Sequence, residues 1–193
     1  RSYNKEFSVG FYEKSVLVGF LLIGYRKIGN NKKFYDAGTG VIKEYRRKGI
    51  GNKLLNETKK IMKENDINTF LLEVLEKNTS AIQLYKKNGF KIERKLNCYN
   101  ITKVDEHNNN IEDRVVKEID VEEKIKQYCS FELSWQNSFD SYQNIKDKYN
   151  IIIWEKENKL LGYGIIHKYN GNIMQIGIDP VYRNIENLST IIN

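Results

Sequence analysis

The sequence has little proline, cysteine or histidine: its 193 residues include one Pro, two Cys and two His. So little proline argues against a collagen-like or proline-rich scaffold, and 40% hydrophobic content is adequate for a packed core. Cys98 and Cys129 stand far apart and outside any C-x-x-C pair, so neither a disulfide framework nor a zinc site is supported. Two histidines also make a His-based metal cluster or a Ser-His-Asp triad hard to build. We therefore expect no metal, and chemistry carried by backbone, tyrosine and carboxylates.

Long apolar runs and targeting signals are also missing. No stretch of ~18 apolar residues could span a membrane, and no charged, apolar and small-residue series marks a signal peptide. We therefore expect a globular, cytoplasmic protein. The net charge of +7 and the pI near 9.2 fit an anionic ligand, whether a nucleotide-like cofactor, nucleic acid or a membrane surface. Because Lys and Arg are scattered among Asp and Glu, nucleic acid and membrane are not expected as partners.

The first part of the chain predicts strands, a helix and another strand. Apolar and polar residues alternate over 7–12, and a polar turn leads into 16–25, which together predict a strand hairpin. Gly29-Asn30-Asn31 predicts a second turn into a third strand ending near Val41-Ile42, which completes an antiparallel meander. Apolar residues then recur at three- and four-residue steps over 50–62, the pattern of an amphipathic helix. The apolar run Thr69–Leu75 predicts a central strand covered on both faces and reached by a parallel crossover.

A second helix is expected between Asn78 and Gly89. Asn78, Thr79 or Ser80 can accept a helix N-terminal amide, and Gly89 supplies the left-handed residue that ends a helix. Residues 90–101 resume strand character, and a polar tract that begins at Asp105 is the best linker candidate in the chain. We expect domains over 1–104 and 113–193, joined by a linker at 105–112.

The strand-to-helix junction Arg46–Gly51 is a candidate anion site. Its glycines let backbone amides approach a ligand, and the helix N-terminus adds partial positive charge, which favours a pyrophosphate. The junction has neither G-x-x-x-x-G-K-[ST] nor G-x-G-x-x-G. An ordinary glycine-containing turn with solvated basic residues is the alternative interpretation of the loop taken alone.

Several further motifs follow in a fixed order. They are Arg46-x-x-Gly49-x-Gly51, Leu72-Glu73-Val74, Asn78-x-x-Ala81-Ile82-x-Leu84-Tyr85 and Gly89-Phe90. This series resembles the acetyl-CoA-binding core of the GNAT superfamily of N-acetyltransferases, and the catalytic stretch is most similar to the ribosomal-protein alanine N-acetyltransferases. The stretches Ala37–Ile42, Leu96–Tyr99 and Ser134–Ser138 resemble bacterial tandem GNAT proteins of unassigned substrate. Together these cover nearly the whole chain, and they imply a mixed α/β (α+β) sheet of GNAT type.

The resemblance also implies roles for individual residues. The strand before the loop splays from its neighbour, so that its backbone contacts the pantetheine arm and the acetyl carbonyl, and the loop wraps the pyrophosphate. Asn78 would hold the cofactor arm, and Tyr85 would protonate the leaving thiolate. The cofactor-binding residues implied are Thr39, Gly40, Val41, Arg46, Arg47, Lys48, Gly49, Ile50, Gly51 and Asn78.

Glu73 is the second catalytic candidate because it interrupts an apolar strand. We expect it to be buried on one face with Leu71 and Leu75, where desolvation would raise its pKa towards a value useful for a base. A strand-end carboxylate paired with Lys or Arg is the alternative. For Tyr85 the alternative is a core tyrosine with its hydroxyl at the surface.

The second part of the chain repeats the first. Gly177–Arg183 matches Gly40–Arg46, and Glu157–Tyr163 matches Lys14–Phe20, which favours an internal duplication. The further elements expected are a strand over Val115–Ile119, helical structure over about Val121–Lys148, strands Ile151–Trp154 and Leu160–His167, a turn at Gly171-Asn172 and a strand Ile173–Ile178.

The second copy departs from the pattern in its loop. Asn184–Leu188 has no glycine where Gly49 and Gly51 stand in the first copy, and Glu186 would repel a phosphate. We therefore expect a degenerate, truncated second copy that does not bind CoA. The first copy starts at its hairpin, without the family's initial strand and helices. Residues 113–149 could supply them, the two halves could share a sheet, or the chain could pair with a second copy as a homodimer.

The function expected is transfer of acetyl from acetyl-CoA to a primary amine, either of a small molecule or at a peptide N-terminus. The competing hypothesis is a non-catalytic, CoA-binding regulatory module, which the degenerate second copy would fit. No loop carries a motif that identifies the acceptor amine.

Overall fold

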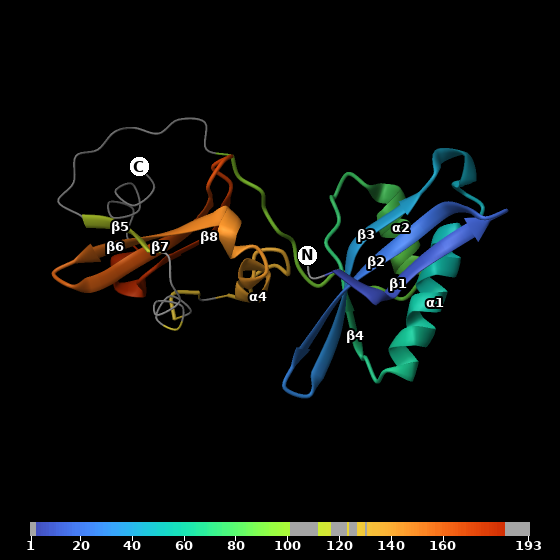
Figure 1. Cartoon of the computed structure of the whole chain (residues 1–193), viewed down its shortest axis with the longest axis horizontal. Coiled ribbons are helices and arrows are strands. Elements are labelled where there is room, and N and C mark those ends of the chain that lie inside the picture. Colours follow the sequence, from blue (N-terminus) through green and yellow to red (C-terminus); the bar gives the residue numbers. More distant parts are fainter. Residues whose placement is uncertain (1–2, 101–111, 117–122, 124–126, 130, 184–193) are drawn as a thin grey trace. The chain divides into compact units, whose positions relative to one another are not determined.

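The chain forms two compact units, Arg1–Leu96 and Asn97–Asn193, and each is described by itself. The structure, a computed structural model, describes residues 3–100, 112–116, 123, 127–129 and 131–183 (Figure 1).

The first unit is built on a four-stranded mixed sheet in the order β1-β2-β3-β4. The strands are β1 (Tyr3–Glu13), β2 (Val16–Ile28), β3 (Asn31–Val41) and β4 (Thr69–Leu71). The first three pair antiparallel, and β4 pairs parallel to β3, so the predicted meander and parallel crossover are confirmed.

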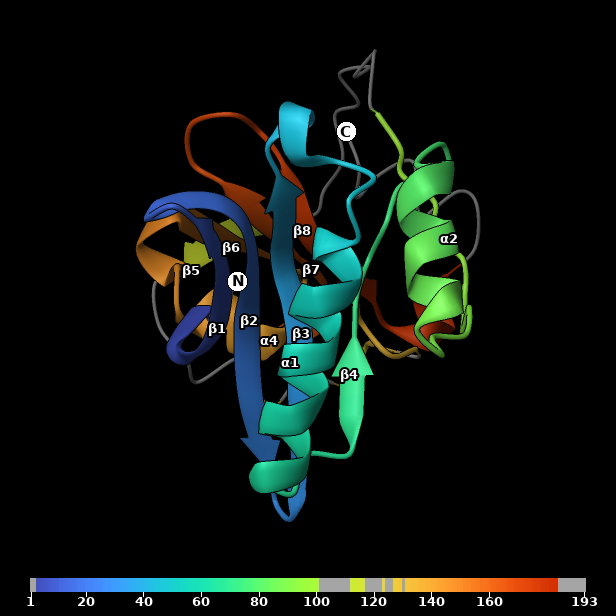
Figure 2. The same ribbon diagram turned by 90° about the vertical axis from the view of Figure 1, so that its right-hand side faces the viewer.

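Two helices and this sheet pack around one buried core. A short 3-10 helix, η1 (Lys43–Tyr45), leads into α1 (Ile50–Glu64), and α2 (Thr79–Lys87) follows β4. In Figure 2, α1 lies across β2 and β3, and α2 lies on the side of β4. Side chains of α1, β2 and β3 form the buried cluster, and Leu84 and Tyr85 of α2 pack against it. The amphipathic pattern therefore placed α1 correctly, with Ile50, Leu54 and Leu55 buried.

Two expectations about the end of the first unit are wrong. The strand expected over Thr69–Leu75 stops at Leu71, and it lies at the edge of the described sheet. The described part of 90–101, which is 90–100, forms no strand. These two facts are related, because residues 91–100 are exposed and form no strand beside β4, so β4 has β3 alone as a partner among the described strands.

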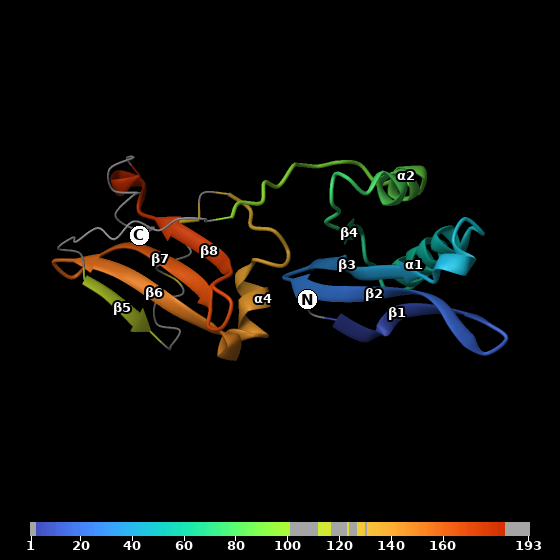
Figure 3. The same ribbon diagram turned by 90° about the horizontal axis from the view of Figure 1, so that it is seen from above.

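The second unit contains an antiparallel sheet in the order β5-β6-β7-β8 (Figure 3). Its elements are β5 (Glu112–Val116), α4 (Phe139–Gln143), the 3-10 helix η3 (Lys146–Lys148), β6 (Tyr149–Lys156), β7 (Lys159–His167), β8 (Ile173–Ile178) and the 3-10 helix η4 (Pro180–Tyr182). Tyr142 of α4 belongs to the buried cluster of this unit, and Tyr128 and Cys129 pack against it. The described part of 113–149 therefore packs within the second unit.

Local geometry recurs between the units at matching sequence positions. The β1–β2 turn places Lys14 and Ser15 at positive φ (47° and 66°), and the β6–β7 turn does the same with Glu157 and Asn158 (52° and 61°). In both units the register of the following strand pair shifts once. The shift falls between the pairs Leu22↔Gly38 and Ile23↔Asp36 in the first, and between Ile165↔Gln175 and Ile166↔Ile173 in the second.

Several predictions for the second unit fall outside the described residues. Residues 105–111 of the linker expected over 105–112 and the glycine-free loop Asn184–Leu188 lie there, while Glu112 is the first residue of β5. Of the helical structure expected over 121–148, the described residues form the short helices α4 and η3, while residues 131–137 are not helical.

Candidate active site

The end of β3, over residues 38–41, has a free edge. The β3–β4 ladder ends at the pair Tyr35↔Leu71, although β3 continues to Val41 alongside β2. Over 38–41 the edge on the side of β4 therefore lies beyond this ladder and has no strand partner among the described residues. Gly38, Gly40 and Val41 are half-buried on this stretch, and Thr39 is exposed. This is the geometry that lets an extended ligand pair with strand backbone.

The loop after this strand delivers the N-terminus of α1 without a side-chain cap. Gly49 is the N-cap residue at φ 78°, a left-handed conformation that glycine adopts without strain, and Arg47 is also left-handed at φ 60°. No side chain among the described residues caps this end of α1, and its first turn contains no acidic residue. The first-turn amides are thus oriented towards an anion that approaches from the loop.

Basic side chains surround this helix end. Arg46 donates from Nε to the Val41 carbonyl at 3.0 Å, which fixes the guanidinium beside the end of β3. Lys48 Nζ lies 4.8 Å from the centre of the Tyr45 ring, a cation–π contact. Arg46, Arg47 and Lys48 are all exposed, so their charges are available to a phosphate.

Close packing joins α1 to α2. A Cβ on Gly51 would lie 2.8 Å from Leu84 Cδ2, so the absence of a side chain at Gly51 lets α2 approach. Asn78 caps α2, since its Oδ1 accepts a hydrogen bond from the Ala81 amide at 3.2 Å. Gly89, at φ 87°, closes the helix as predicted, with the Phe90 amide donating to the Tyr85 carbonyl at 3.1 Å.

Tyr85 reaches from α2 to β3. Its ring packs edge-on against Phe90 at 5.5 Å between centres, and its hydroxyl donates to Asp36 Oδ2 at 2.8 Å. Burial raises the pKa of Tyr85 above the ordinary tyrosine value, and the negative charge and hydrogen bond of Asp36 raise it further, whereas a hydrogen bond with Thr39 lowers it. Tyr85 therefore keeps its proton at neutral pH and holds it beside the free edge of β3.

Asp36 is the site residue that sequence reasoning missed. It is 8% exposed, and its carboxylate also accepts from the Gly38 amide at 3.0 Å and from Thr39 Oγ1 at 2.6 Å. A signal was present, because Asp36 is the one acid in the apolar strand segment Phe34–Ala37, as Glu73 is in Thr69–Leu75.

Glu73 is not where the sequence placed it. It lies two residues beyond the end of β4 and is exposed, and Leu75, expected on the same buried face, is 76% exposed. The expected burial was wrong because β4 is short, so desolvation no longer supports a role for Glu73 as a base.

The site therefore combines a free strand edge, an uncapped helix N-terminus with basic neighbours, and a protonated tyrosine. Together they can bind an extended ligand that carries a pyrophosphate, and they can give up a proton beside the strand. A pantetheine-linked nucleotide fits this arrangement, because Gly49 and the uncapped turn of α1 leave the phosphate position without a competing side chain.

Comparison with known proteins identifies the class to which the first unit is related. The sequence model of the Acetyltransferase (GNAT) family matches residues 1–90. That family transfers acetyl groups from acetyl-CoA. The match ends within the first unit, so it concerns the half of the chain that contains this site.

Individual relatives share the same region. An N-alpha-acetyltransferase 50 of Danio rerio is 37% identical over 46% of this chain and 54% of its own length. An N-alpha-acetyltransferase of Sulfurisphaera tokodaii is 44% identical over 35% of this chain and 41% of its own. Among solved structures, Arabidopsis thaliana Naa50 in complex with a bisubstrate analogue is 32% identical over 46% of this chain and 60% of its own, with a TM-score of 0.43. The chain thus spans about half, or less, of the curated relatives it matches.

None of the helices in the described residues has the length and apolar character needed to cross a membrane.

Proposed function

We propose that this protein is an acetyl-CoA-dependent N-acetyltransferase whose cofactor site lies in the first unit. The observation that carries the proposal is the continuity of the site. β3, with its free edge, is followed by η1 and the loop that leads to the uncapped N-terminus of α1, and the Tyr85 hydroxyl is hydrogen-bonded to the same strand at Asp36. The family match over residues 1–90 supports the same chemistry.

Each part of the site has a task in such a transfer. Amine attack on a thioester needs a polarised carbonyl and a proton for the departing thiolate. Bound acetyl-CoA supplies the acetyl group as a thioester. The backbone of Thr39, Gly40 and Val41 would hold the pantetheine arm and the carbonyl. The amides and basic side chains of Arg46–Gly51 would hold the pyrophosphate, and the Tyr85 hydroxyl would supply the proton.

Asn78 and Glu73 have weaker support. The Oδ1 of Asn78 is engaged as the cap of α2, which leaves its amide nitrogen to meet the cofactor arm. Glu73 lies outside the sheet, where it could act as a base only for an amine bound at the surface.

The acceptor we favour is the α-amino group of a peptide. The two curated relatives described above are N-alpha-acetyltransferases, which supports a peptide N-terminus as the acceptor. A small primary amine is the alternative acceptor.

We also propose that the second unit is a duplicated copy that has lost cofactor binding. Equivalent hydrogen bonds support the duplication: Arg46 Nε donates to the carbonyl of Val41, five residues earlier, and Arg183 Nε donates to that of Ile178 at 2.9 Å. The turn angles and register shifts of the two units agree as well.

An acceptor panel tests the proposed activity. Acetyl-CoA consumption would be measured with peptides bearing a free N-terminus, with the same peptides N-terminally blocked but carrying lysine, and with small polyamines. CoA binding would be titrated alongside. We expect turnover with free N-termini and little with blocked peptides. Tight CoA binding without turnover of any amine would instead favour the regulatory module.

A further inference from the structure

Asp36 is a buried acid at the centre of the site, in a strand otherwise made for a hydrophobic core. A buried carboxylate is strongly unfavourable unless hydrogen bonds replace its lost water. Here three donors do so, from Gly38, Thr39 and Tyr85. The first two lie within three residues of Asp36 and close a local turn across the register shift of β3. The third comes from α2, 49 positions away in sequence.

The two oxygens of this carboxylate have separate tasks. Oδ1 accepts from the Gly38 amide, while Oδ2 accepts from both Thr39 Oγ1 and Tyr85 Oη. Because one oxygen takes both hydroxyl donors, the Tyr85 hydroxyl is held next to Thr39, where the free edge of β3 is exposed. Without this acceptor the hydroxyl would lose its bond to the carboxylate, and packing of the ring against Phe90 and the buried cluster would orient the ring but not the hydroxyl.

We infer that Asp36 is a positioning residue for Tyr85, which draws the phenol proton towards its carboxylate and fixes the hydroxyl beside Thr39 at the free edge of β3. The inference rests on the proposed function only for the use of that proton in acetyl transfer. The hydrogen bond itself is a property of the folded first unit.

The raised pKa of Tyr85 agrees with this role, since burial and Asp36 both favour the protonated phenol. A tyrosine held in this way stays protonated through neutral and mildly alkaline pH. A thiolate that forms beside it is a weaker base than the Tyr85 phenolate, so the hydroxyl would stabilise the thiolate as a hydrogen-bond donor.

A first test needs no cofactor. With tyrosines labelled with ¹³C at Cζ, the Tyr85 NMR signal would be assigned by its loss in Tyr85→Phe, then compared at neutral pH and in a titration past the ordinary tyrosine pKa of about 10. We expect the neutral-pH signal of Tyr85 to move in Asp36→Asn, because its hydrogen bond to a charged carboxylate is lost, and any ionisation of Tyr85 to begin at lower pH than in the wild type. An unchanged Tyr85 signal at neutral pH would overturn the inference. If Asp36→Asn does not fold, the ¹³Cγ chemical shift of Asp36 is compared between the wild type and Tyr85→Phe instead. Loss of the hydrogen bond should move that signal, and an unchanged shift would overturn the inference.

A second test uses turnover. Asp36→Asn should lower kcat about tenfold to a hundredfold, with KM for acetyl-CoA changed less than about twofold, because the cofactor contacts remain. In a Tyr85→Phe background it should lower kcat no further, since Asp36 acts through Tyr85. Unchanged kcat, or a loss that multiplies with that of Tyr85→Phe, would overturn the inference.

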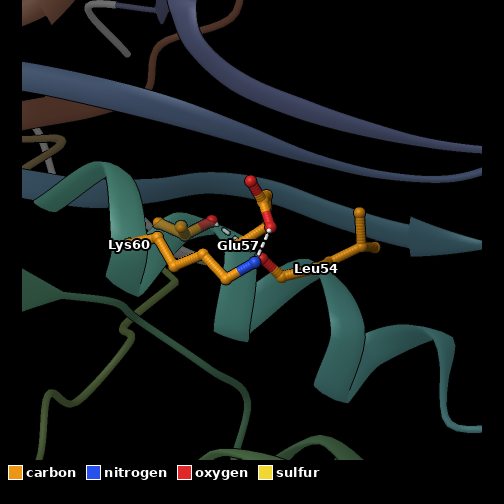
Figure 4. Close-up of polar contacts among 4 residues, drawn as sticks. Leu54, Glu57 and Lys60 are labelled. Carbon is orange, nitrogen blue, oxygen red and sulfur yellow. Dashed lines mark hydrogen bonds and ion pairs between the residues drawn. The ribbon is translucent and has the colours of Figure 1, made fainter.

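The chain offers a matched control on the surface of α1. Glu57 also accepts a hydrogen bond, from Lys60 Nζ at 2.9 Å (Figure 4), but both side chains are largely exposed. Glu57→Gln therefore removes a bonded carboxylate without touching the site, and kcat should stay within about twofold of the wild type. A wild type that neither binds nor uses acetyl-CoA would refute the proposed function, while the NMR titration would still decide the role of Asp36.

Discussion

The strand pairs β2–β3 of the first unit and β7–β8 of the second have similar registers but differ in side chains at corresponding positions. In the first unit, Phe20 pairs in register with Gly40, and in the second, Tyr163 pairs with Gly177. Two residues earlier on the last strand of each pair, the first unit has Gly38 and the second has Gln175. In the first unit, Gly38 and Gly40 therefore lie on β3, the strand that has the free edge.

In the second unit, a hydrogen-bonded side chain occupies the position that corresponds to Gly38 of the first unit. Tyr163 is fully buried and donates to Gln175 Oε1 at 3.1 Å, and Gln175 Nε2 donates to the Asn137 carbonyl at 2.6 Å. Cys129 Sγ lies 2.9 Å from the Tyr163 hydroxyl. The difference teaches that a hydrogen-bonded side chain such as Gln175 packs the second unit at the position where the first unit has Gly38 beside its free strand edge. It supports, independently of the loop Asn184–Leu188, a second unit without a cofactor.

The largest expected difference between the units concerns Tyr85 of the first unit and the buried Tyr163 of the second. Tyr85→Phe should lower kcat about a hundredfold with little change in the affinity for CoA, because it removes the proton donor alone. Tyr163→Phe should leave kcat unchanged and lower the stability of the second unit by about 1–3 kcal/mol, because the contacts of its hydroxyl with Gln175 and Cys129 are lost. Steady-state kinetics and thermal unfolding of both variants measure this. Equal kinetic effects of the two changes would break the comparison.

Two glycines distinguish the packing of the units. Gly162→Ala should destabilise the second unit by about 1–3 kcal/mol, since the new Cβ would lie 2.9 Å from the Gly177 carbonyl oxygen, which cannot move freely. Gly51→Ala should change stability by less than about 1 kcal/mol, because it meets the mobile end of Leu84 and gains helix propensity. Denaturant unfolding checks both values, and a larger loss for Gly51→Ala would show that α1 and α2 are more tightly fixed than described.

The matched arginines test where the phosphates bind. Arg46→Gln should weaken CoA binding about tenfold, equivalent to about 1.4 kcal/mol, because one charged phosphate contact is lost. Arg183→Gln loses the same local hydrogen bond to a carbonyl five residues earlier, so it controls for the structural effect. Calorimetric titration should give the wild-type affinity for Arg183→Gln.

Asn78 should give the smallest effect. Asn78→Ser keeps a side-chain oxygen for the cap of α2 but removes the amide donors, so CoA affinity should fall about threefold while the unfolding temperature stays unchanged. Ser138→Asn, at the cap of α4, is the control and should alter neither quantity. A fall in unfolding temperature for Asn78→Ser would mean that its role is structural.

Sequence patterns predicted the helices and turns that are determined by residues close together in the chain. The apolar period placed α1, Gly89 ended α2, and Gly29 marked a hairpin turn at φ 58°. The length of β4 depended on whether residues 90–100 would pair beside it, which no local pattern encodes. Asp36 was missed for a similar reason, since its partner Tyr85 becomes a neighbour only after α2 packs on the sheet.

The central claim is that the chain has one cofactor site, and that the first unit holds it. Calorimetric titration of the whole chain with CoA tests this most directly through the stoichiometry. We predict one CoA bound per chain, with an affinity that Arg46→Gln weakens and Arg183→Gln leaves intact. Two CoA molecules per chain, no binding, or loss of binding in Arg183→Gln would contradict the claim.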